Sequence, residues 1–243
     1  MAPPPGYVSY GGPGAAMSGN LQPIAGLTKA AVALQIAAIA LGAITVVLQF
    51  GLARRADDLL SNIITERDFE DSLGVFTLFS LLAGAVSIAL LVVSIIWSFR
   101  ISANLTALGR QITWKSGLTV VAWLLGGCTL HIITFLMLRE HWQASDSDVA
   151  PGDQSWKSRP VLGLITAWFV AVISGTLVGL IGGGRLISQG FNMGDDLTEV
   201  ADSMRDGYLT NALGGVIGIV GGVILVMIIR QLGARHMRLT REA

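Results

Sequence analysis

The chain has 243 residues and sets 16 basic residues against 16 acidic ones, so its formal net charge is zero. Hydrophobic residues make up 52% and charged residues 13%, with a mean hydropathy of +0.65, whereas a soluble domain spends about a quarter of its residues on charge. This composition excludes an ordinary soluble domain and disfavours nucleic acid as a partner, and it predicts an all-α protein embedded in a lipid bilayer.

The chain begins with a segment that is rich in Pro, Gly, Ala and Ser and carries no charge before Lys29. Such a composition has too little apolar surface to fold. We expect residues 1–26 to form a disordered tail. A cleaved signal peptide is not expected, because the basic region that opens such a peptide is missing.

Two apolar runs follow, at about residues 27–52 and 73–97. Each is long enough to cross a bilayer core of roughly 30 Å. The segment between them, 53–72, is acidic, and its apolar residues recur at spacings of three, four and seven, which is typical of one face of an amphipathic helix. We expect this segment to lie on the bilayer surface or to pack over the bundle.

Two later runs, 161–183 and 212–229, repeat the order of span, acidic loop and span. Glycines recur at every fourth position in both runs, at Gly175, Gly179 and Gly183 and at Gly214, Gly218 and Gly222. Close backbone contact supplies much of the packing energy between helices in lipid, so we expect the two helices to pack antiparallel along these stripes. The alternative is that glycine is simply common in membrane helices.

The middle run, 118–138, is compatible with two topologies. As a fifth span it would put the two acidic loops on opposite sides of the membrane. As a re-entrant or interfacial helix, kinked at Gly126 and Gly127, it leaves a four-span bundle of two helical hairpins with both termini on one side. We favour four spans, because the acidic loops then share a face and because paired glycines followed by polar residues make a poor lipid-facing centre.

The distribution of Lys and Arg is compatible with cytoplasmic termini but does not by itself decide between the two topologies. With four spans and cytoplasmic termini, 11 basic residues lie inside and 5 outside, whereas the best five-span arrangement gives 10 and 6. We therefore expect a multi-pass protein of the plasma membrane with both termini cytoplasmic. Its membrane domain would cover residues 27–232, and residues 233–243 would form a basic C-terminal tail.

Several short motifs along the chain carry a family resemblance. They are Trp97-x-x-Arg100-x-x-x-Asn104, Glu140-x-Trp142-x-Ala144-Ser145-Asp146, Trp168 and Arg230-Gln231-Leu232. Over roughly residues 27–232 they resemble the uncharacterised actinobacterial membrane proteins gathered as the domain of unknown function forty-three twenty-eight. The middle run departs from that family pattern, because Gly126 occupies the position of a proline and Thr129 that of an asparagine. The resemblance implies a membrane architecture and brings no activity or cofactor.

Polar and aromatic side chains concentrate around the middle run. The candidate ligand-binding cluster consists of Trp97, Arg100, Asn104, His131, Arg139, Glu140 and Trp142. Arg100 and Asn104 share a helix face, and an Arg100–Glu140 pair is compatible with their positions at the membrane boundary. Two interpretations stay open: a site near the inner leaflet for an anion, a lipid headgroup or a small solute, or interfacial anchoring by Trp97 and Arg100 with local pairing of Glu140.

Few residues suggest metal or catalytic chemistry. Cys128 and His131 are spaced C-x-x-H and His141 follows, but a zinc site needs about four convergent ligands. Nucleophilic triads, phosphate loops and intramembrane carboxylates are not evident in the sequence, so we expect no metal, no cofactor and no enzyme. A structural, accessory or regulatory membrane component with a membrane-protein partner or a second copy of itself is favoured. The alternative is a conduit or carrier for a small solute or lipid, which should gather Asn104, Thr129 and His131 around one water-filled cavity.

Overall fold

The computed structural model describes residues 21–190 and 197–242, and their side chains except at 182–190, 197–200, 202–204 and 206. The helices are α1 (Ala25–Leu60), α2 (Glu66–Ala107), α3 (Ser116–Leu124), α4 (Ile132–Ala144), α5 (Gly163–Gly190) and α6 (Leu197–Thr240), with the short 3₁₀ turns η2 (Gly127–Thr129) and η3 (Ser155–Ser158). In the described part of the chain α1, α2, most of α5 and most of α6 are long and apolar enough to cross a membrane. The all-α class is confirmed.

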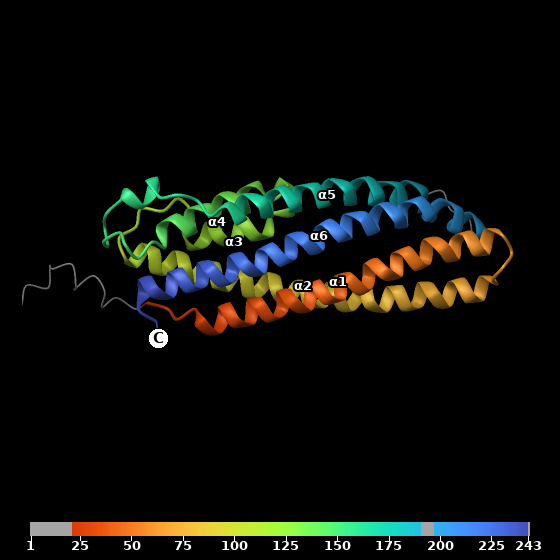
Figure 1. Ribbon diagram of the computed structural model, residues 1–243, viewed down its shortest axis with the longest axis horizontal. Coiled ribbons are helices and arrows are strands. Elements are labelled where there is room, and N and C mark those ends of the chain that lie inside the picture. The colour runs from red at the N-terminus through yellow and green to blue at the C-terminus, as the bar shows by residue number, and fades with distance from the viewer. Residues whose placement is uncertain (1–20, 191–196, 243) are drawn as a thin grey trace, which may run out of the picture.

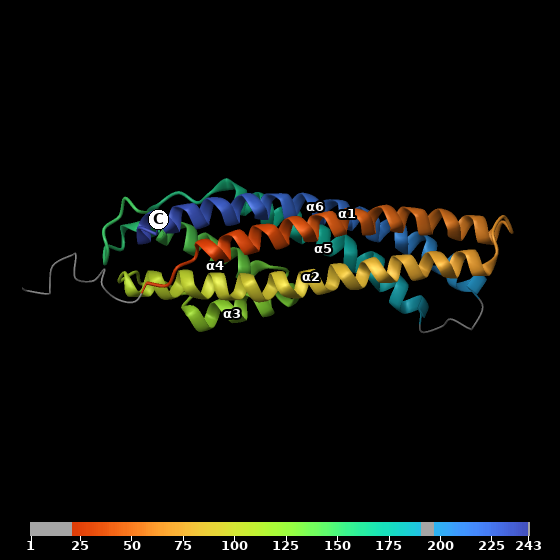
Figure 2. The same cartoon turned by 90° about the horizontal axis from the view of Figure 1, so that it is seen from below.

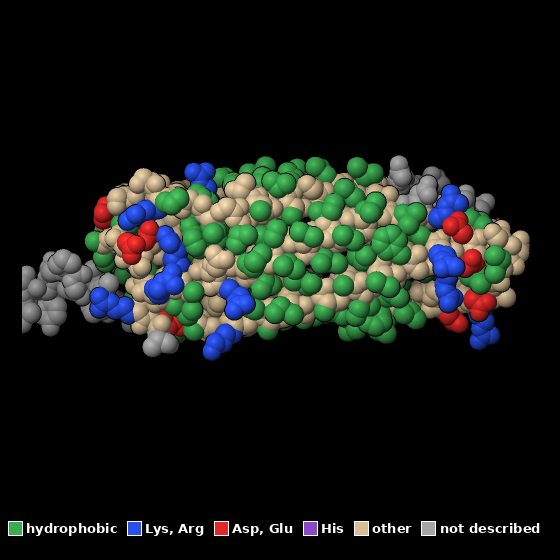
Figure 3. Space-filling view, viewed as in Figure 1, with side chains coloured by type: hydrophobic (Ala, Val, Ile, Leu, Met, Phe, Trp, Pro, Cys, Tyr) green, Lys and Arg blue, Asp and Glu red, His purple; other side chains and the backbone are tan. Residues whose placement is uncertain are grey.

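The long helices form two antiparallel hairpins, α1 with α2 and α5 with α6 (Figure 1). Helix α6 packs against both α1 and α5, so it joins the two hairpins. The start of α1 and the end of α6 lie at one end of the molecule, which we name the termini end, and residues 53–72 lie at the other, which we name the acidic end (Figures 1 and 2). Charged side chains gather in bands at both ends, with an apolar belt between them (Figure 3). The predicted four-span bundle is confirmed.

Helices α3 and α4 form a re-entrant hairpin that enters and leaves at the termini end (Figure 1). The chain reverses where Leu130 and His131 take left-handed conformations, with φ of 49° and 61°, which are uncommon for residues other than glycine. A Cβ atom at Gly126 would lie 2.7 Å from the Thr134 hydroxyl oxygen, so the tight return requires glycine there. The five-span alternative is therefore wrong, and the break at the paired glycines is confirmed.

The re-entrant hairpin makes the two halves of the bundle different. At the termini end it fills the space between α2 and α5, and the main core includes Trp97, Met137, Trp156 and Trp168. Beyond the hairpin tip α2 packs mainly against α1. Only 6% of the most apolar stretch of α2 is buried in the protein, compared with 28% for α6. The packed core is therefore concentrated at the termini end.

The acidic segment 53–72 forms no separate surface helix, because α1 and α2 simply extend past the apolar belt. Thr65 ends the turn between them with a capping box, in which its hydroxyl accepts from the Asp68 N–H (3.3 Å) and the Asp68 carboxylate accepts from the Thr65 N–H (3.0 Å). A second core cluster holds the extensions together, and it consists of Leu52, Ala53, Ala56, Leu59, Phe69, Ala201 and Tyr208. The predicted apolar face thus packs between spans that project from the membrane.

Residues 21–26 and 233–240, which the sequence predicts to be parts of two tails, belong to the helical bundle in the structure. Residues from 21 onward are placed against the bundle, while the part before residue 21 lies outside the described residues. Helix α6 continues through most of the C-terminal segment. The Glu242 carboxylate explains both differences, because it accepts from the Ile24 and Ala25 N–H groups at 2.8 Å each and so satisfies the free amides at the start of α1.

The glycine stripes of α5 and α6 approach each other at one point. A Cβ atom at Gly175 would lie 3.4 Å from the Gly214 carbonyl oxygen, and one at Gly214 would lie 3.3 Å from the Gly175 carbonyl oxygen and 3.3 Å from the Gly179 nitrogen. Backbone therefore lies against backbone at the Gly175–Gly214 crossing.

The other stripe glycines have different surroundings. A Cβ atom at Gly179 or Gly218 would meet no heavy atom within 4 Å, and one at Gly222 would lie 2.9 Å from Ile39 of α1. The surroundings of Gly183 lie outside the described residues. The stripe on α6 thus serves two neighbours, with Gly214 against α5 and Gly222 against α1.

The re-entrant topology can be checked with reporters fused to the full chain. A reporter after Lys157, in the loop between α4 and α5, is expected on the same side of the membrane as a C-terminal reporter. A reporter after Ser61, in the turn between α1 and α2, is expected on the opposite side. Paired fusions to a cytoplasmically active and an externally active enzyme measure this, and a Lys157 reporter on the Ser61 side would contradict the topology.

Candidate functional site

Two members of the predicted cluster, Trp97 and Arg100, fasten α2 to the start of α1. The Trp97 indole is buried, and its Nε1 donates to the Thr28 hydroxyl at 3.0 Å. Arg100 donates to the Pro23 carbonyl at 2.8 Å. Both side chains therefore hold the N-terminal residues in place, and Trp97 packs inside the protein.

Glu140 is engaged by the loop between α2 and α3. Its two carboxylate oxygens accept from the Thr113 and Trp114 N–H groups, each at 2.8 Å. Arg100 has its own partner at Pro23, so the predicted Arg100–Glu140 pair is wrong. The loop amides are closer to Glu140 because the re-entrant hairpin places α4 directly beside this loop.

Trp142 and Arg139 lie three residues apart on α4 but have different surroundings. The Arg235 guanidinium stacks on the Trp142 ring, 4.6 Å from its centroid, and the indole donates to the Pro160 carbonyl at 3.2 Å. Arg139 is exposed. Trp142 thus helps to bind α6 to α4, whereas Arg139 stays available at the surface.

His131, Thr129 and Asn104 occupy different places. His131 lies at the hairpin tip with its ring edge-on to Trp168, at 6.0 Å between centroids. The Thr129 hydroxyl donates to the Leu125 carbonyl of its own turn at 3.0 Å. Asn104 is bound to Gln22 at the termini end. The three residues therefore do not surround one cavity, as a conduit would require.

Asn104 anchors a buried chain of hydrogen bonds. Its Oδ1 accepts from the Gln22 N–H at 2.7 Å, and its Nδ2 donates to the Gln22 carbonyl at 2.9 Å, which fixes the orientation of the amide. The Nδ2 also faces Nε2 of His236 at 3.2 Å, so this ring nitrogen must be the acceptor. His236 Nδ1 then carries the proton and donates to the Ser145 hydroxyl at 3.0 Å.

A second buried pair joins Ser102 to His141. The Ser102 hydroxyl donates its one proton to the Trp114 carbonyl at 2.8 Å, so it accepts from His141 Nε2 at 2.8 Å. Among the described residues no protein group reaches His141 Nδ1. Burial lowers the pKa of His141 to about 4, so its ring is neutral at physiological pH.

These assignments bear directly on catalysis. A histidine that activates a serine nucleophile removes the proton from the serine hydroxyl. Here each histidine donates its proton to the serine, and Ser102 and Ser145 are both fully buried. The two serine–histidine pairs are therefore oriented for packing and are oriented wrongly for nucleophilic attack.

A charged group completes the network around Asp146. Its carboxylate lies 2.9 Å from Arg235 and 3.2 Å from Arg159. Arg110 is buried and donates to three backbone carbonyls, those of Asp146, Val149 and Asp153. The loop between α4 and α5 is thereby joined to α6 and to the loop between α2 and α3.

Together these contacts build one rigid structure at the termini end, which we name the termini platform. It consists of residues 21–24, 108–115, 139–162 and 233–242. Asn104, Glu140 and Trp142 belong to the cluster predicted from the sequence, whereas their partners do not. Two signals in the sequence point to the missing partners. Ser145 and Asp146 belong to the motif that begins at Glu140, and His236 is one of only three histidines in the chain.

A pocket of about 460 Å³ opens on the platform. It is lined by Thr113, Trp114, Leu136, Arg139, Glu140, Gln143, Trp156 and Lys157. Glu140 is occupied by backbone amides, and Lys157 lies 5.5 Å from the centroid of the Trp156 ring. Among the described residues neither Arg139 nor Lys157 pairs with a carboxylate, so this pocket has an excess of positive charge.

Comparison with known proteins places the chain in a family. No curated protein and no solved structure matches it. The family model described as "Domain of unknown function (DUF4328)" matches residues 62–234, from the turn before α2 to the last turns of α6. This match covers more than half of the chain, and the protein belongs to that family.

Proposed function

We propose that the protein is an accessory or regulatory membrane component without catalytic activity, and that its termini platform docks a partner. The observation that carries this proposal is the buried polar network around the two serine–histidine pairs. Ser102, Ser145, His141 and His236 are fully buried and bond to one another or to backbone. Their hydrogen bonds make the platform rigid, and a preorganised surface loses less entropy when it binds.

The distribution of basic residues supports a cytoplasmic position for the termini platform. Eleven of the 16 basic residues belong to the termini end, and basic residues favour the cytoplasmic side. The platform then faces the cytoplasm and carries the exposed cations Arg139 and Lys157 on its surface. A partner with an acidic surface suits this charge.

Affinity purification of the N-terminally tagged full chain in mild detergent tests the proposal. A stoichiometric partner is expected, and the double exchange Arg139→Glu with Lys157→Glu should reduce its recovery at least about ten-fold. The matched control is Arg54→Glu with Arg67→Glu, two exposed cations at the acidic end, and it should retain the partner. Recovery of the protein alone, or equal loss in both variants, would contradict the proposal.

A second candidate is a carrier for an anionic lipid, and the 460 Å³ pocket favours it. Arg139 and Lys157, which have no carboxylate partner among the described residues, line this pocket together with Trp114 and Trp156 and suit a phosphate group at the membrane surface. The same variants separate the candidates in a vesicle-transfer assay with dioleoylphosphatidylglycerol. Loss of transfer on reversing Arg139 and Lys157, with the partner unaffected, favours the carrier.

A further inference from the structure

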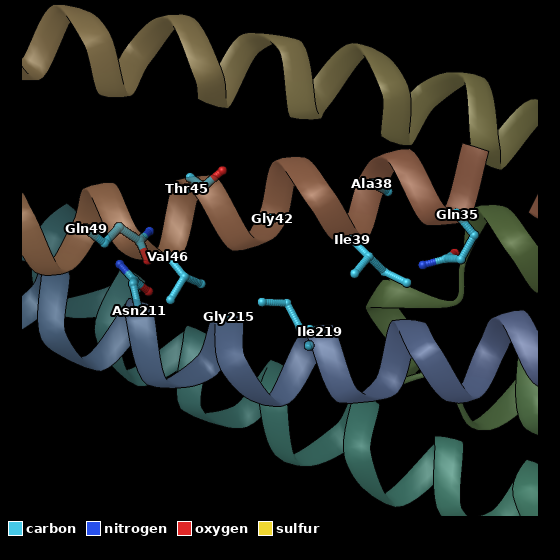
Figure 4. Close-up of a pocket in the computed structure, with 11 residues that line it drawn as sticks. Gln35, Ala38, Ile39, Gly42, Thr45, Val46, Gln49, Asn211, Gly215 and Ile219 are labelled. Atoms are coloured by element: carbon cyan, nitrogen blue, oxygen red, sulfur yellow. The ribbon is translucent and has the colours of Figure 1, made fainter. Parts of the chain in front are cut away.

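A groove between α1 and α6 lies within the membrane-spanning part of the molecule (Figure 4). Its volume is about 340 Å³. Its lining combines three amide side chains, a hydroxyl and small residues, among them Gln35, Thr45, Gln49, Asn211, Gly42 and Gly215. A mostly apolar hollow with a few polar groups is the usual composition of a small-molecule site.

Gln35 is the informative residue of this groove. It is only 7% exposed, its amide is not completely enclosed by protein, and no group among the described residues forms a hydrogen bond with that amide. Figure 4 shows the amide on the side of α1 that faces α6. A Cβ atom at Gly222 of α6 would lie 3.0 Å from the Gln35 Nε2. Glycine at that position therefore makes the space into which the amide points.

The depth of Gln35 makes its unpaired amide costly. It follows Lys29 by six residues, or about 9 Å of helix, and Gln49 lies about 21 Å further along α1. The groove thus runs through the hydrocarbon region, where water is scarce. Leaving an amide without hydrogen-bond partners in such surroundings is strongly unfavourable. A hydrogen-bonding molecule from outside the chain removes this cost.

The lining restricts the chemistry of that molecule. It contains no charged residue, so the ligand is neutral. Amides both donate and accept, while the Thr45 hydroxyl already donates to the Leu41 carbonyl at 2.6 Å and is left as an acceptor. A ligand with both carbonyl and hydroxyl groups matches these partners. The groove is only partly enclosed by protein, so that acyl chains can extend into the bilayer.

We propose that the groove between α1 and α6 binds the head of a neutral glycerolipid, of which a diacylglycerol is the simplest. Gln35 bonds the ester and hydroxyl oxygens of the head, and Gln49 and Asn211 line the far end. This site is separate from the termini platform and does not depend on the proposed function. Reversal of Arg139 and Lys157 leaves glycerolipid binding unchanged, so each proposal fails or stands on its own result.

Binding of dioleoylglycerol to the purified full chain, measured by native mass spectrometry, tests the site. Gln35→Leu should weaken binding about ten-fold, because the hydrogen bonds of the amide are lost. Gly222→Ala should also weaken it, since the added methyl displaces an amide that is still present. The control is Gln231→Leu, the same exchange on the exposed face of α6, which should bind as the unaltered chain does.

Three results would overturn the proposal. One is binding of dioleoylglycerol to Gln35→Leu with unchanged affinity. Another is equal, Gln35-dependent binding of dioleoylphosphatidylcholine, which shares the acyl chains but lacks the free hydroxyl and would mark the groove as a place for ordinary bilayer lipid. The third is no binding of dioleoylglycerol at all, with the groove filled by water. Thermal unfolding of each variant is measured in the same samples. The variant Gln35→Leu should be at least as stable as the unaltered chain, because the substitution removes an unpaired amide.

Discussion

Replacing Gly214 by leucine is expected to force α5 away from α6 and to lower the midpoint of thermal unfolding by about 6–12 °C. A Cβ atom there would lie 3.3 Å from the Gly175 carbonyl oxygen and 3.3 Å from the Gly179 nitrogen. Both are backbone atoms, which cannot move aside as a flexible side chain can. Overpacking of this kind costs about 3 kcal/mol, which corresponds to that shift in a chain of this size. Gly175→Leu should act similarly from the other side of the contact.

Substitutions at different positions of the stripe distinguish a steric clash at the Gly175–Gly214 crossing from a requirement for glycine throughout both helices. Gly179→Ala and Gly218→Ala are the matched controls, because an added Cβ at either position meets no heavy atom within 4 Å. Both should unfold within about 2 °C of the unaltered chain, as substitutions without a new contact usually do. Thermal unfolding in detergent, followed by intrinsic fluorescence, measures all four variants. Equal destabilisation by the controls would show that helix flexibility, and not the crossing, makes glycine necessary.

The architecture could be predicted from the sequence because lipid imposes simple rules. A run of about 20 apolar residues must either span the bilayer or be covered by other parts of the protein. Four helices of this kind are present in the described part of the chain. The paired glycines predict the break before the reversal of the re-entrant hairpin, and Gly126 is the one that the structure requires, because only a residue without a side chain allows Thr134 to approach so closely. These signals are local, and they do not depend on distant partners.

The boundaries and the partners of polar residues depend on contacts far apart in sequence. Glu242 holds Ile24, more than two hundred residues away, and nothing local to either residue announces it. Asn104 was selected as a candidate, yet its partners Gln22 and His236 come from the two segments that were assigned to tails. Periodicity and motif spacing report one element at a time, so they locate a polar residue without showing what it bonds.

Gln35 shows a different gap between sequence and structure. An uncharged polar residue in an apolar run is compatible with a span, so the sequence predicts the span without singling out Gln35. Its significance appears only when Gly222 of another helix is placed beside it and the amide is seen to lack a partner. Polar residues within spans are costly wherever they stay unpaired, and the structure separates this one from Thr45, which bonds to its own helix.

Acid should destabilise the protein through His141, which lies outside the four spans. Burial lowers the pKa of His141 from 6.5 to about 4 in the folded protein. Between these values the unfolded chain binds more protons than the folded one, so the free energy of unfolding falls as the pH drops through this window and levels off near the lower value. A shift of this size corresponds to about 3 kcal/mol.

The exchange His141→Gln isolates this contribution, because carboxylates titrate in part of the same window. Glutamine keeps a donor for the Ser102 hydroxyl, which itself donates to the Trp114 carbonyl, but it cannot be protonated. Between pH 7 and pH 4 the midpoint temperature of thermal unfolding should therefore fall about 6–12 °C further in the unaltered chain than in the variant. If the unfolding midpoints of the unaltered chain and of His141→Gln change in parallel with pH, water reaches the imidazole in the folded protein. Its Nδ1, which has no hydrogen-bond partner among the described residues, would then be solvated, and the termini platform would be open at its centre.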